Sequence, residues 1–389
     1  MKVKKITFSA RPASNGLWLI VIFALLVVVL TVSIYSVGWS VSWRYLAPTM
    51  SPPFADMRTV QGAILSERLG YNPQYENPGD PWGRPMNYPM VWLFVAKTLS
   101  LEVELHFLLF VAAYVALFVV VLIWLLARYP SAWLLAACCS SATLLAVERG
   151  NNDIVIFVLL TIAFASRWGI VSSVGVLAAC YLKLFPIAAA CVLLRRPILL
   201  LLTVTFFLTY VAVSWSDVLG TLNGVPASAH LSYGTKSLAA ICGYSIRWSV
   251  ILAAHAALGV AVTVIFRSQF TSIFKGARED VGFRLFLGGA SIYVLTFAIS
   301  SSWDYRLIFL ILCIPWLADA ERSKRCSGFL IAILIAMCDY WLSPLGIVAR
   351  VAVVTAKTAI FVVFFAILLT HVTELAHSLH LRRYLSRAK

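Results

Sequence analysis

Charged residues are scarce in this chain of 389 amino acids. Asp, Glu, Lys and Arg together make up 12% of it, whereas a soluble domain usually carries about 25%. The chain also lacks a long polar segment: the longest, at about residues 38–87, is rich in proline and glycine and too short to bury a core of its own. Both shortages argue against a soluble enzyme and predict one integral-membrane domain that spans residues 1–389.

Several catalytic motifs are missing as well. The sequence contains no P-loop, no HExxH, no GxSxG and no CxxC framework, which argues against nucleotide hydrolysis and against zinc or serine hydrolase chemistry. Its eight cysteines lie mostly inside apolar runs and have neither disulfide nor metal-site spacing.

Apolar runs, by contrast, recur from Leu17 almost to the end of the chain. They predict an all-α polytopic bundle of about 10–13 spans, although several runs are shorter than the roughly 20 residues that a straight span needs. Short helices are tolerated where they are buried in protein or line a cavity, so we expect a site inside the bundle. The predicted spans lie at about 17–37, 105–127, 131–147, 152–165, 170–182, 186–194, 197–214, 249–266, 285–302, 306–318, 328–342 and 347–370.

The placement of charge predicts an orientation. Basic residues gather in alternate loops, at Arg128, Arg167 and Arg195 for example, which are therefore expected in the cytoplasm. This pattern predicts a cytoplasmic (inner) membrane protein with both termini in the cytoplasm, and it explains the formal charge of +15 without a nucleic-acid partner. Most acidic residues fall in the other loops, the largest of which are outer loops at about 38–88 and 215–248. This skew indicates either a catalytic or cation-binding outer surface or simple solvation of the outer loops, and the first alternative predicts an active site on the periplasmic side.

The first outer loop holds the strongest candidate for catalysis. Asp56 precedes a predicted interfacial helix at 57–69, so it is either the N-cap of that helix or a base that takes a proton from an acceptor hydroxyl. Tyr88, where the loop returns to the membrane, is either an interfacial anchor or part of an aromatic platform for a sugar ring or a lipid headgroup.

The polar junction ERGNND, at residues 148–153, lies between two apolar runs. Asn151 or Asn152 could cap the next helix, whereas Arg149 beside a helix N-terminus suits an anion such as phosphate.

Lys183 interrupts a further apolar run, and we expect two short helices to meet between it and Pro186. An intramembrane lysine is a functional candidate that suits a lipid phosphate, and the alternative is that it reaches the interface to meet water.

Asp304 and Arg306 follow a later span. They could pair with each other, or Arg306 could contact phosphate while Asp304 orients it. In the loop at 215–248, His230 is either a general acid or base or incidental.

Several of these features occur together in one family. The features are Asp56 with its interfacial helix, the turn GYNPQY at 70–75, the pair Tyr88-Pro89, the GNND junction at 150–153 and the KLFP break at 183–186. They resemble the GT-C superfamily of integral-membrane glycosyltransferases, and within it the polyprenyl-phosphate-mannose-dependent mannosyltransferases of phosphatidylinositol mannoside synthesis. The motif resemblance covers about residues 17–197. Where the family has Tyr-Pro-Pro this chain has YPM at 88–90, and where it has Gly-Gln-x-Asn this chain has GNND.

The resemblance implies an inverting transfer of a hexose or pentose from a polyprenyl-phosphate sugar to a hydroxyl of a lipid or glycan acceptor, with Asp56 as general base. Arg149, Lys183 and Arg306 are candidates for the lipid phosphate because of their charge and location. No cofactor is assigned, although a divalent metal between Asp56 and Asp153 or Asp304 stays open. Further expected substrate contacts are Arg58, Tyr88, Glu148, Asn151, Asn152, Asp153, His230, Lys236, Asp304 and Tyr305. The alternatives are a flippase or transporter of a lipid-linked saccharide and a polysaccharide polymerase.

Overall fold

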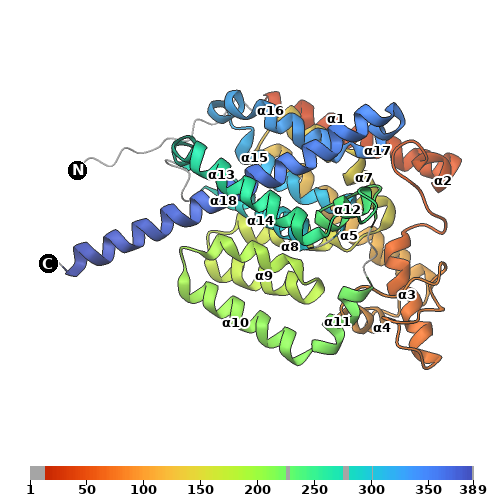
Figure 1. Ribbon diagram of the computed structural model, residues 1–389. Helices are drawn as coiled ribbons and strands as arrows, with labels where there is room; N and C mark the ends of the chain where they lie inside the picture. Colours follow the sequence, from red (N-terminus) through yellow and green to blue (C-terminus); the bar gives the residue numbers. More distant parts are fainter. Residues whose placement is uncertain (1–13, 225–227, 275–279, 300, 388–389) are drawn as a thin grey trace.

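The computed structural model describes residues 14–224, 228–274, 280–299 and 301–387 and is almost entirely helical (Figure 1), which confirms the all-α prediction. The first half contains α1 (Ser14–Val37), α2 (Trp39–Trp43), α3 (Ala55–Arg68), α4 (Val91–Thr98), α5 (Glu104–Arg128), α6 (Ala132–Cys138), α7 (Ser141–Arg149), α8 (Asp153–Ala165), α9 (Gly169–Leu182) and the 3₁₀ helix η1 (Phe185–Leu193). The second half contains α10 (Pro197–Val213), α11 (Trp215–Asn223), β1 (Ser232–Tyr233), α12 (Thr235–Ile241), α13 (Trp248–Phe274), α14 (Val281–Ile299), β2 (Ser302–Trp303), η2 (Asp304–Cys313), α15 (Ile314–Leu317), α16 (Ala320–Met337), α17 (Asp339–Leu342), η3 (Ser343–Leu345) and α18 (Ile347–Arg387).

Six helical stretches within the described residues are long and apolar enough to cross a membrane, and the number rises to eight if each of two sharply bent helix pairs is one span. The chain is therefore a multi-pass membrane protein. Fewer spans pass this test than the 10–13 predicted, because four predicted spans form short elements. One of them, α8, has 13 residues and a length of about 20 Å, against a hydrocarbon layer of about 30 Å. The six stretches are 16–37, 104–128, 132–149, 248–272, 281–299 and 347–377, and the bent pairs are α10 with α11 and α16 with α17.

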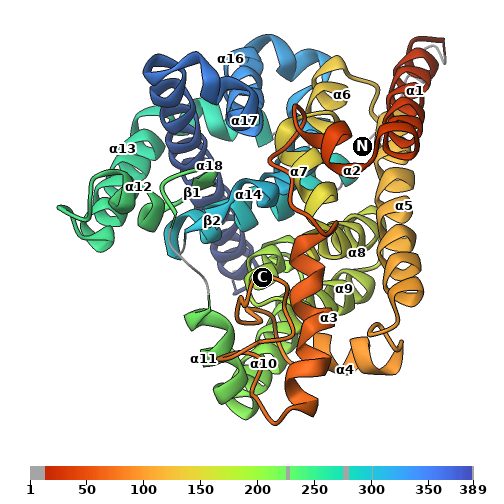
Figure 2. The same cartoon turned by 90° about the vertical axis from the view of Figure 1, so that its right-hand side faces the viewer.

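Helix α14 lies at the centre of the bundle, where it packs against α8, α18, η1 and η2 (Figures 1 and 2). Its two adjacent glycines allow this close packing. A Cβ at Gly288 would lie 2.2 Å from the ring of Phe164, and one at Gly289 would lie 2.5 Å from the backbone oxygen of Phe309. Small residues let membrane helices approach closely, so these contacts bring η2 against the middle of the bundle.

The backbone leaves the α-helical path where the polar junctions lie. Helix α9 ends at Leu182, Lys183 is extended (φ −159°, ψ 146°), and η1 follows with Pro186 in its first turn, as predicted for this break. A second break precedes η2, where β1 and β2 pair in an antiparallel register with Ser232 opposite Trp303. Irregular backbone at membrane depth needs the cover of surrounding protein, and almost all of η2 is buried.

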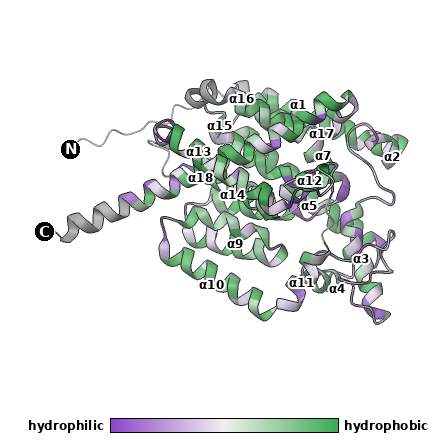
Figure 3. Cartoon of the chain, in the orientation of Figure 1, coloured by the Kyte–Doolittle hydropathy of each residue, from purple (hydrophilic) through white to green (hydrophobic). Residues whose placement is uncertain are grey.

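The first loop forms a polar end of the molecule around α3, in contrast to the mostly apolar bundle (Figure 3). The helix predicted at 57–69 is confirmed as α3. Asp56 is not its N-cap, however, because Phe54 occupies that position with φ 64° and Asp56 lies in the first turn. The C-terminal end of α18 projects from the opposite end of the molecule (Figure 1). Residues 1–13, on which the predicted location of the N-terminus depends, lie outside the described residues.

The segment between α3 and α4 folds back on α3 through two glycines. The Ser66 hydroxyl donates to Asn77 Oδ1 (2.7 Å) and accepts from the Gly79 backbone N–H (2.9 Å). Asn77 Nδ2 in turn donates to the backbone oxygen of Thr59 (3.0 Å). At the closest point a Cβ on Gly62 would lie 2.4 Å from the carbonyl carbon and oxygen of Gly79. The loop can therefore rest on α3 only if residue 62 has no side chain.

We expect Gly62→Ala to lower the thermal unfolding midpoint of the detergent-solubilised protein. Overpacking costs about 1–3 kcal/mol, and the added Cβ would meet the backbone of Gly79 rather than a flexible side chain. Gly328→Ala in α16 is the control, since a Cβ there meets nothing within 4 Å. Equal midpoints for the two variants, measured by differential scanning fluorimetry, would contradict the close approach of α3 and the loop.

Candidate functional site

Arg84 reaches the first turn of α3 because Asp80 holds it there. The Asp80 carboxylate accepts from the backbone N–H of Arg84 (2.9 Å), from its Nε (3.1 Å) and from its Nη2 (2.9 Å). The Nη2 group also donates to the backbone oxygen of Ala55. Burial lowers the pKa of Arg84, but the hydrogen bonds and charge of Asp80 raise it, and the net result is a pKa above the usual value. The loop thus presents a fixed, fully protonated guanidinium.

Asp56 is held between this guanidinium and the junction that precedes α8. Asn151 Nδ2 donates to Asp56 Oδ2 at 2.6 Å, and Arg84 Nη1 lies 3.6 Å from Oδ1. The Asn151 amide is itself oriented, because its Oδ1 accepts from the Asp153 backbone N–H (2.8 Å) and from Lys183 Nζ (3.4 Å). The Asn151 side chain therefore accepts a hydrogen bond from the first residue of α8, which is one of the two capping roles predicted for this junction. It also positions Asp56.

Gly150 allows the two segments to meet. It ends α7 in the left-handed region (φ 55°), which glycine adopts at little cost. A Cβ there would lie 2.9 Å from Cβ of Phe54, the N-cap residue of α3. The Tyr114 hydroxyl donates to the Gly150 backbone oxygen and holds the turn in place.

A cavity of about 380 Å³ opens beside Asp56, within the range of about 300–1,000 Å³ for small-ligand sites. Among the described residues, its charged lining consists of Asp56, Arg84 and Arg149. Tyr88 and Tyr305, two more of the predicted site residues, also line it. Burial raises the pKa of the Tyr88 phenol well above its usual value, and the Asp56 charge acts in the same direction, so Tyr88 is a neutral hydroxyl. The other lining residues are Pro48, Met50, Thr59, Pro85, Asn87, Leu145, Gly224, Leu231 and Trp303.

Behind this cavity, Asp153 binds two cations. Its Oδ1 accepts from Lys183 Nζ at 2.5 Å and its Oδ2 accepts from Arg306 Nε at 3.1 Å, and all three side chains are largely buried. Lys183 also lies 5.0 Å from the ring centroid of Tyr88. The cluster carries one excess positive charge next to the cavity wall. Neither Lys183 nor Arg306 is among the residues that line the cavity.

The sequence predicts two alternatives for Asp304 and Arg306, and neither describes Asp304: it does not pair with Arg306, and it does not orient that side chain. Successive side chains of η2 point to different neighbours, and Asp304 binds Lys357 of α18 (2.7 and 2.9 Å) while Arg306 turns to Asp153. Lys357 Nζ also donates to Asp339 Oδ2 (2.6 Å) and to the backbone oxygen of Ser232 (3.1 Å). One ammonium group therefore holds β1, η2 and the break before α17 together. Since Asp304 lies between Trp303 and Tyr305, this cluster fixes one wall of the cavity.

A metal between Asp56 and Asp153 or Asp304 is not supported by these contacts, because buried cations occupy both of the latter carboxylates. The part of the chain that the structure describes contains no group of three or more His, Cys, Asp or Glu side chains that could hold a metal ion.

Glu148 shapes the cavity rather than lining it. Its Oε1 accepts from the backbone N–H of Met50 (2.8 Å), and its Oε2 lies 3.2 Å from Arg149 Nε. Arg149 also donates to the backbone oxygen of Pro48 (3.2 Å). The segment before α3 is thus tied to the end of α7. Asn152 is fully buried, and neither of its amide atoms has a hydrogen-bond partner among the described residues.

Three predicted site residues lie elsewhere. Arg58 makes a double hydrogen bond to Glu104 (2.6 and 2.7 Å), which its position two residues after Asp56 on the helix explains. His230 is exposed, and its Nδ1 lies 2.6 Å from Arg350 Nη2. Lys236 occupies a separate surface hollow with Arg247.

Sequence reasoning missed Arg84, Lys357 and Asp339. Arg84 follows Asp80 by four residues in a loop without helical periodicity, so its direction could not be predicted. Lys357 is a lone lysine within the apolar run of α18, the same signal that singled out Lys183.

No protein-family model, no curated protein and no solved structure matches the chain.

We expect Lys357→Met to lower the thermal unfolding midpoint strongly, because it leaves the buried Asp304 and the partly buried Asp339 without their shared cation, and breaking a buried pair costs about 3–5 kcal/mol. Adding Asp304→Asn and Asp339→Asn to the same protein should restore much of the loss. Lys236→Met, at an exposed lysine, is the control. A Lys357→Met protein as stable as the control would show that the cluster does not support the fold.

Proposed function

We propose that this chain is a membrane glycosyltransferase that moves a hexose or pentose from a polyprenyl-phosphate sugar to an acceptor hydroxyl, with inversion and with Asp56 as general base. The observation that carries the proposal is a carboxylate and two arginines lining one cavity in a multi-pass membrane protein. The acceptor is a lipid or a glycan. The resemblance of the first half to GT-C enzymes supports the same reaction.

The hydrogen bonding of Asp56 suits a base. Asn151 donates to Oδ2, whereas Oδ1 accepts no hydrogen bond from a described residue and lies 3.6 Å from Arg84 Nη1. The Asp56 side chain belongs to a residue that lines the cavity. In the reaction, Oδ1 takes the proton of the acceptor hydroxyl as that oxygen bonds to the anomeric carbon. The bond from the anomeric carbon to the phosphate oxygen breaks at the same time, and the polyprenyl phosphate leaves with the electron pair.

Arg84 and Arg149 are the groups suited to the departing phosphate, since both line the cavity and guanidinium groups bind phosphate through paired N–H donors. The Lys183–Asp153–Arg306 cluster behind the cavity wall carries one excess positive charge, which also attracts the phosphate. The low dielectric of the buried protein strengthens this attraction. Direct phosphate contact is thus proposed for Arg84 and Arg149, whereas the sequence predicts it for Arg149, Lys183 and Arg306.

The proposed location of the site is the non-cytoplasmic side of a cytoplasmic (inner) membrane. The distribution of basic loop residues supports it, and so does the position of α3 at the end opposite the basic C-terminal turns of α18 (Figure 1).

Asp56→Asn should abolish sugar transfer in proteoliposomes that contain a polyprenyl-phosphate sugar and acceptor lipids, while donor binding persists, because the amide cannot accept the proton. Glu76→Gln, at an exposed carboxylate of the same loop, is the control and should retain transfer. Wild-type transfer by Asp56→Asn would rule out the base, and lipid-linked sugar transport without any transfer would favour a flippase.

Arg84→Gln should raise the KM for the donor about 10- to 100-fold, the effect of losing one charge-assisted contact of about 1.5–3 kcal/mol. Arg58→Gln is a matched control, because it also removes a paired arginine from this loop but lies outside the cavity. Initial rates at varied donor concentration test the pair, and the same KM in both variants would remove Arg84 from the phosphate site.

A further inference from the structure

A second basic hollow lies away from the Asp56 cavity. Helix α12 packs beside the start of α13 (Figures 1 and 2), and between them a hollow of about 450 Å³ is lined by Lys236, Tyr244, Arg247 and Trp248, with Ala239, Ile246 and Ser249 completing it. None of these residues lines the Asp56 cavity, so the proposed transfer does not use Lys236.

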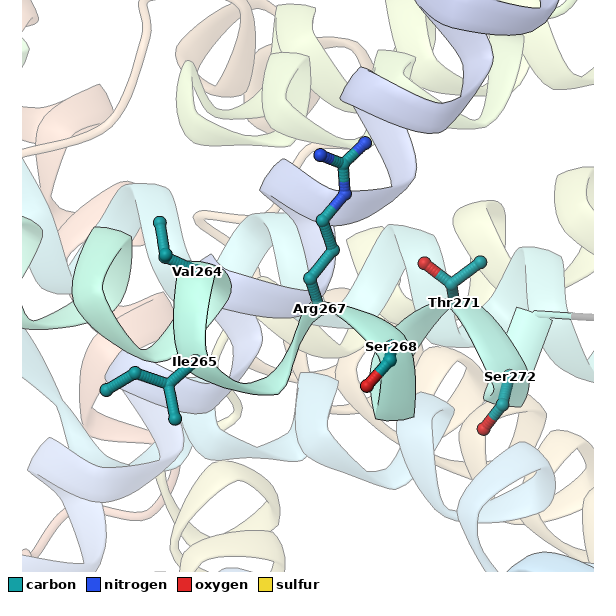
Figure 4. A pocket seen from close by; sticks show the side chains of 6 residues that line it. All are labelled: Val264, Ile265, Arg267, Ser268, Thr271 and Ser272. Atoms are coloured by element: carbon teal, nitrogen blue, oxygen red, sulfur yellow. The ribbon is translucent and has the colours of Figure 1, made fainter.

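Both cations of this hollow lack a carboxylate partner within the described chain. Lys236 Nζ lies 5.9 Å from the ring centroid of Trp248, and among the described residues no acidic side chain pairs with Lys236 or Arg247. A hollow near the other end of α13 shows the contrast: there Arg267 turns toward α18 (Figure 4) and lies 3.2 Å from Glu374 Oε1. The hollow at α12 therefore holds two uncompensated positive charges.

The surroundings of the hollow are apolar and exposed. Ile241, Tyr244 and Ile246 are 47%, 64% and 45% exposed, and Trp248 is 42% exposed. Trp248 also begins a helix long and apolar enough to cross a membrane. Tryptophan and tyrosine with flanking cations at the start of a span are typical of the boundary between hydrocarbon and headgroups, which is the depth of lipid phosphates.

We propose that the hollow between α12 and α13 binds the phosphate of an anionic phospholipid from the surrounding membrane. Lys236 and Arg247 donate to the phosphate oxygens, while the aromatic and aliphatic side chains cover the glycerol region and the start of the acyl chains. The binding is independent of sugar transfer at Asp56. Anionic lipids are favoured over zwitterionic ones because the two cations meet no compensating carboxylate.

Native mass spectrometry of the full chain tests this, with phosphatidylglycerol and phosphatidylcholine titrated separately. Wild type should retain phosphatidylglycerol in preference to phosphatidylcholine, and the double variant Lys236→Gln, Arg247→Gln should lose about 10-fold or more of that affinity, as expected for two cations near a lipid surface. Arg267→Gln should bind like wild type.

The charge-conserving double variant Lys236→Arg, Arg247→Lys should also keep the preference, which separates a charge effect from misfolding. Undiminished phosphatidylglycerol binding by the Gln double variant would overturn the proposal, as would equal binding of both lipids by wild type. Activity of Asp56→Asn has no bearing on either result, so failure here is distinct from failure of the proposed transfer.

Discussion

The ion cluster around Asp153 is the interaction on which the rest of the site depends. One buried carboxylate binds Lys183 and Arg306 and so joins three places at which helices break: the start of α8, the junction of α9 with η1, and η2. Removing one member of such a cluster leaves an uncompensated buried charge, at a cost of about 3–5 kcal/mol. The same junction carries Asn151, which transmits this fixed geometry to Asp56 through a single amide.

Much of the fold follows from patterns local in sequence. Apolar runs predict a helical membrane protein, and the KLFP segment predicts the break after Lys183, because proline and an intramembrane cation both disfavour a continuous span. The sequence predicts 10–13 spans, whereas six to eight stretches of the described residues are long and apolar enough to cross a membrane. An apolar run does not reveal whether it forms a full-length span or a short element such as η2 inside the bundle. Irregular backbone of that kind depends on packing partners far away in the sequence.

The lining of the candidate cavity follows from the sequence only in part, for the same reason. Asp56, Tyr88, Arg149 and Tyr305 do line one cavity, and each lies at a polar junction that the sequence marks. Partners could not be predicted, because ion pairs inside a bundle join residues about 20 to 150 positions apart, a separation that loop closure permits at small extra cost. Arg306 illustrates this: its partner lies 153 residues away, whereas the nearby Asp304 binds a different helix.

The central claim is that the cavity beside Asp56 receives the phosphate of a lipid-linked sugar. A cryo-electron microscopy structure of the full chain with a bound polyprenyl phosphate tests it most directly. The account predicts phosphate oxygens within hydrogen-bond distance of Arg84 or Arg149, with Asp56 at the edge of the space left for the sugar. A phosphate bound outside that cavity, with the cavity closed or filled by the protein itself, would contradict it.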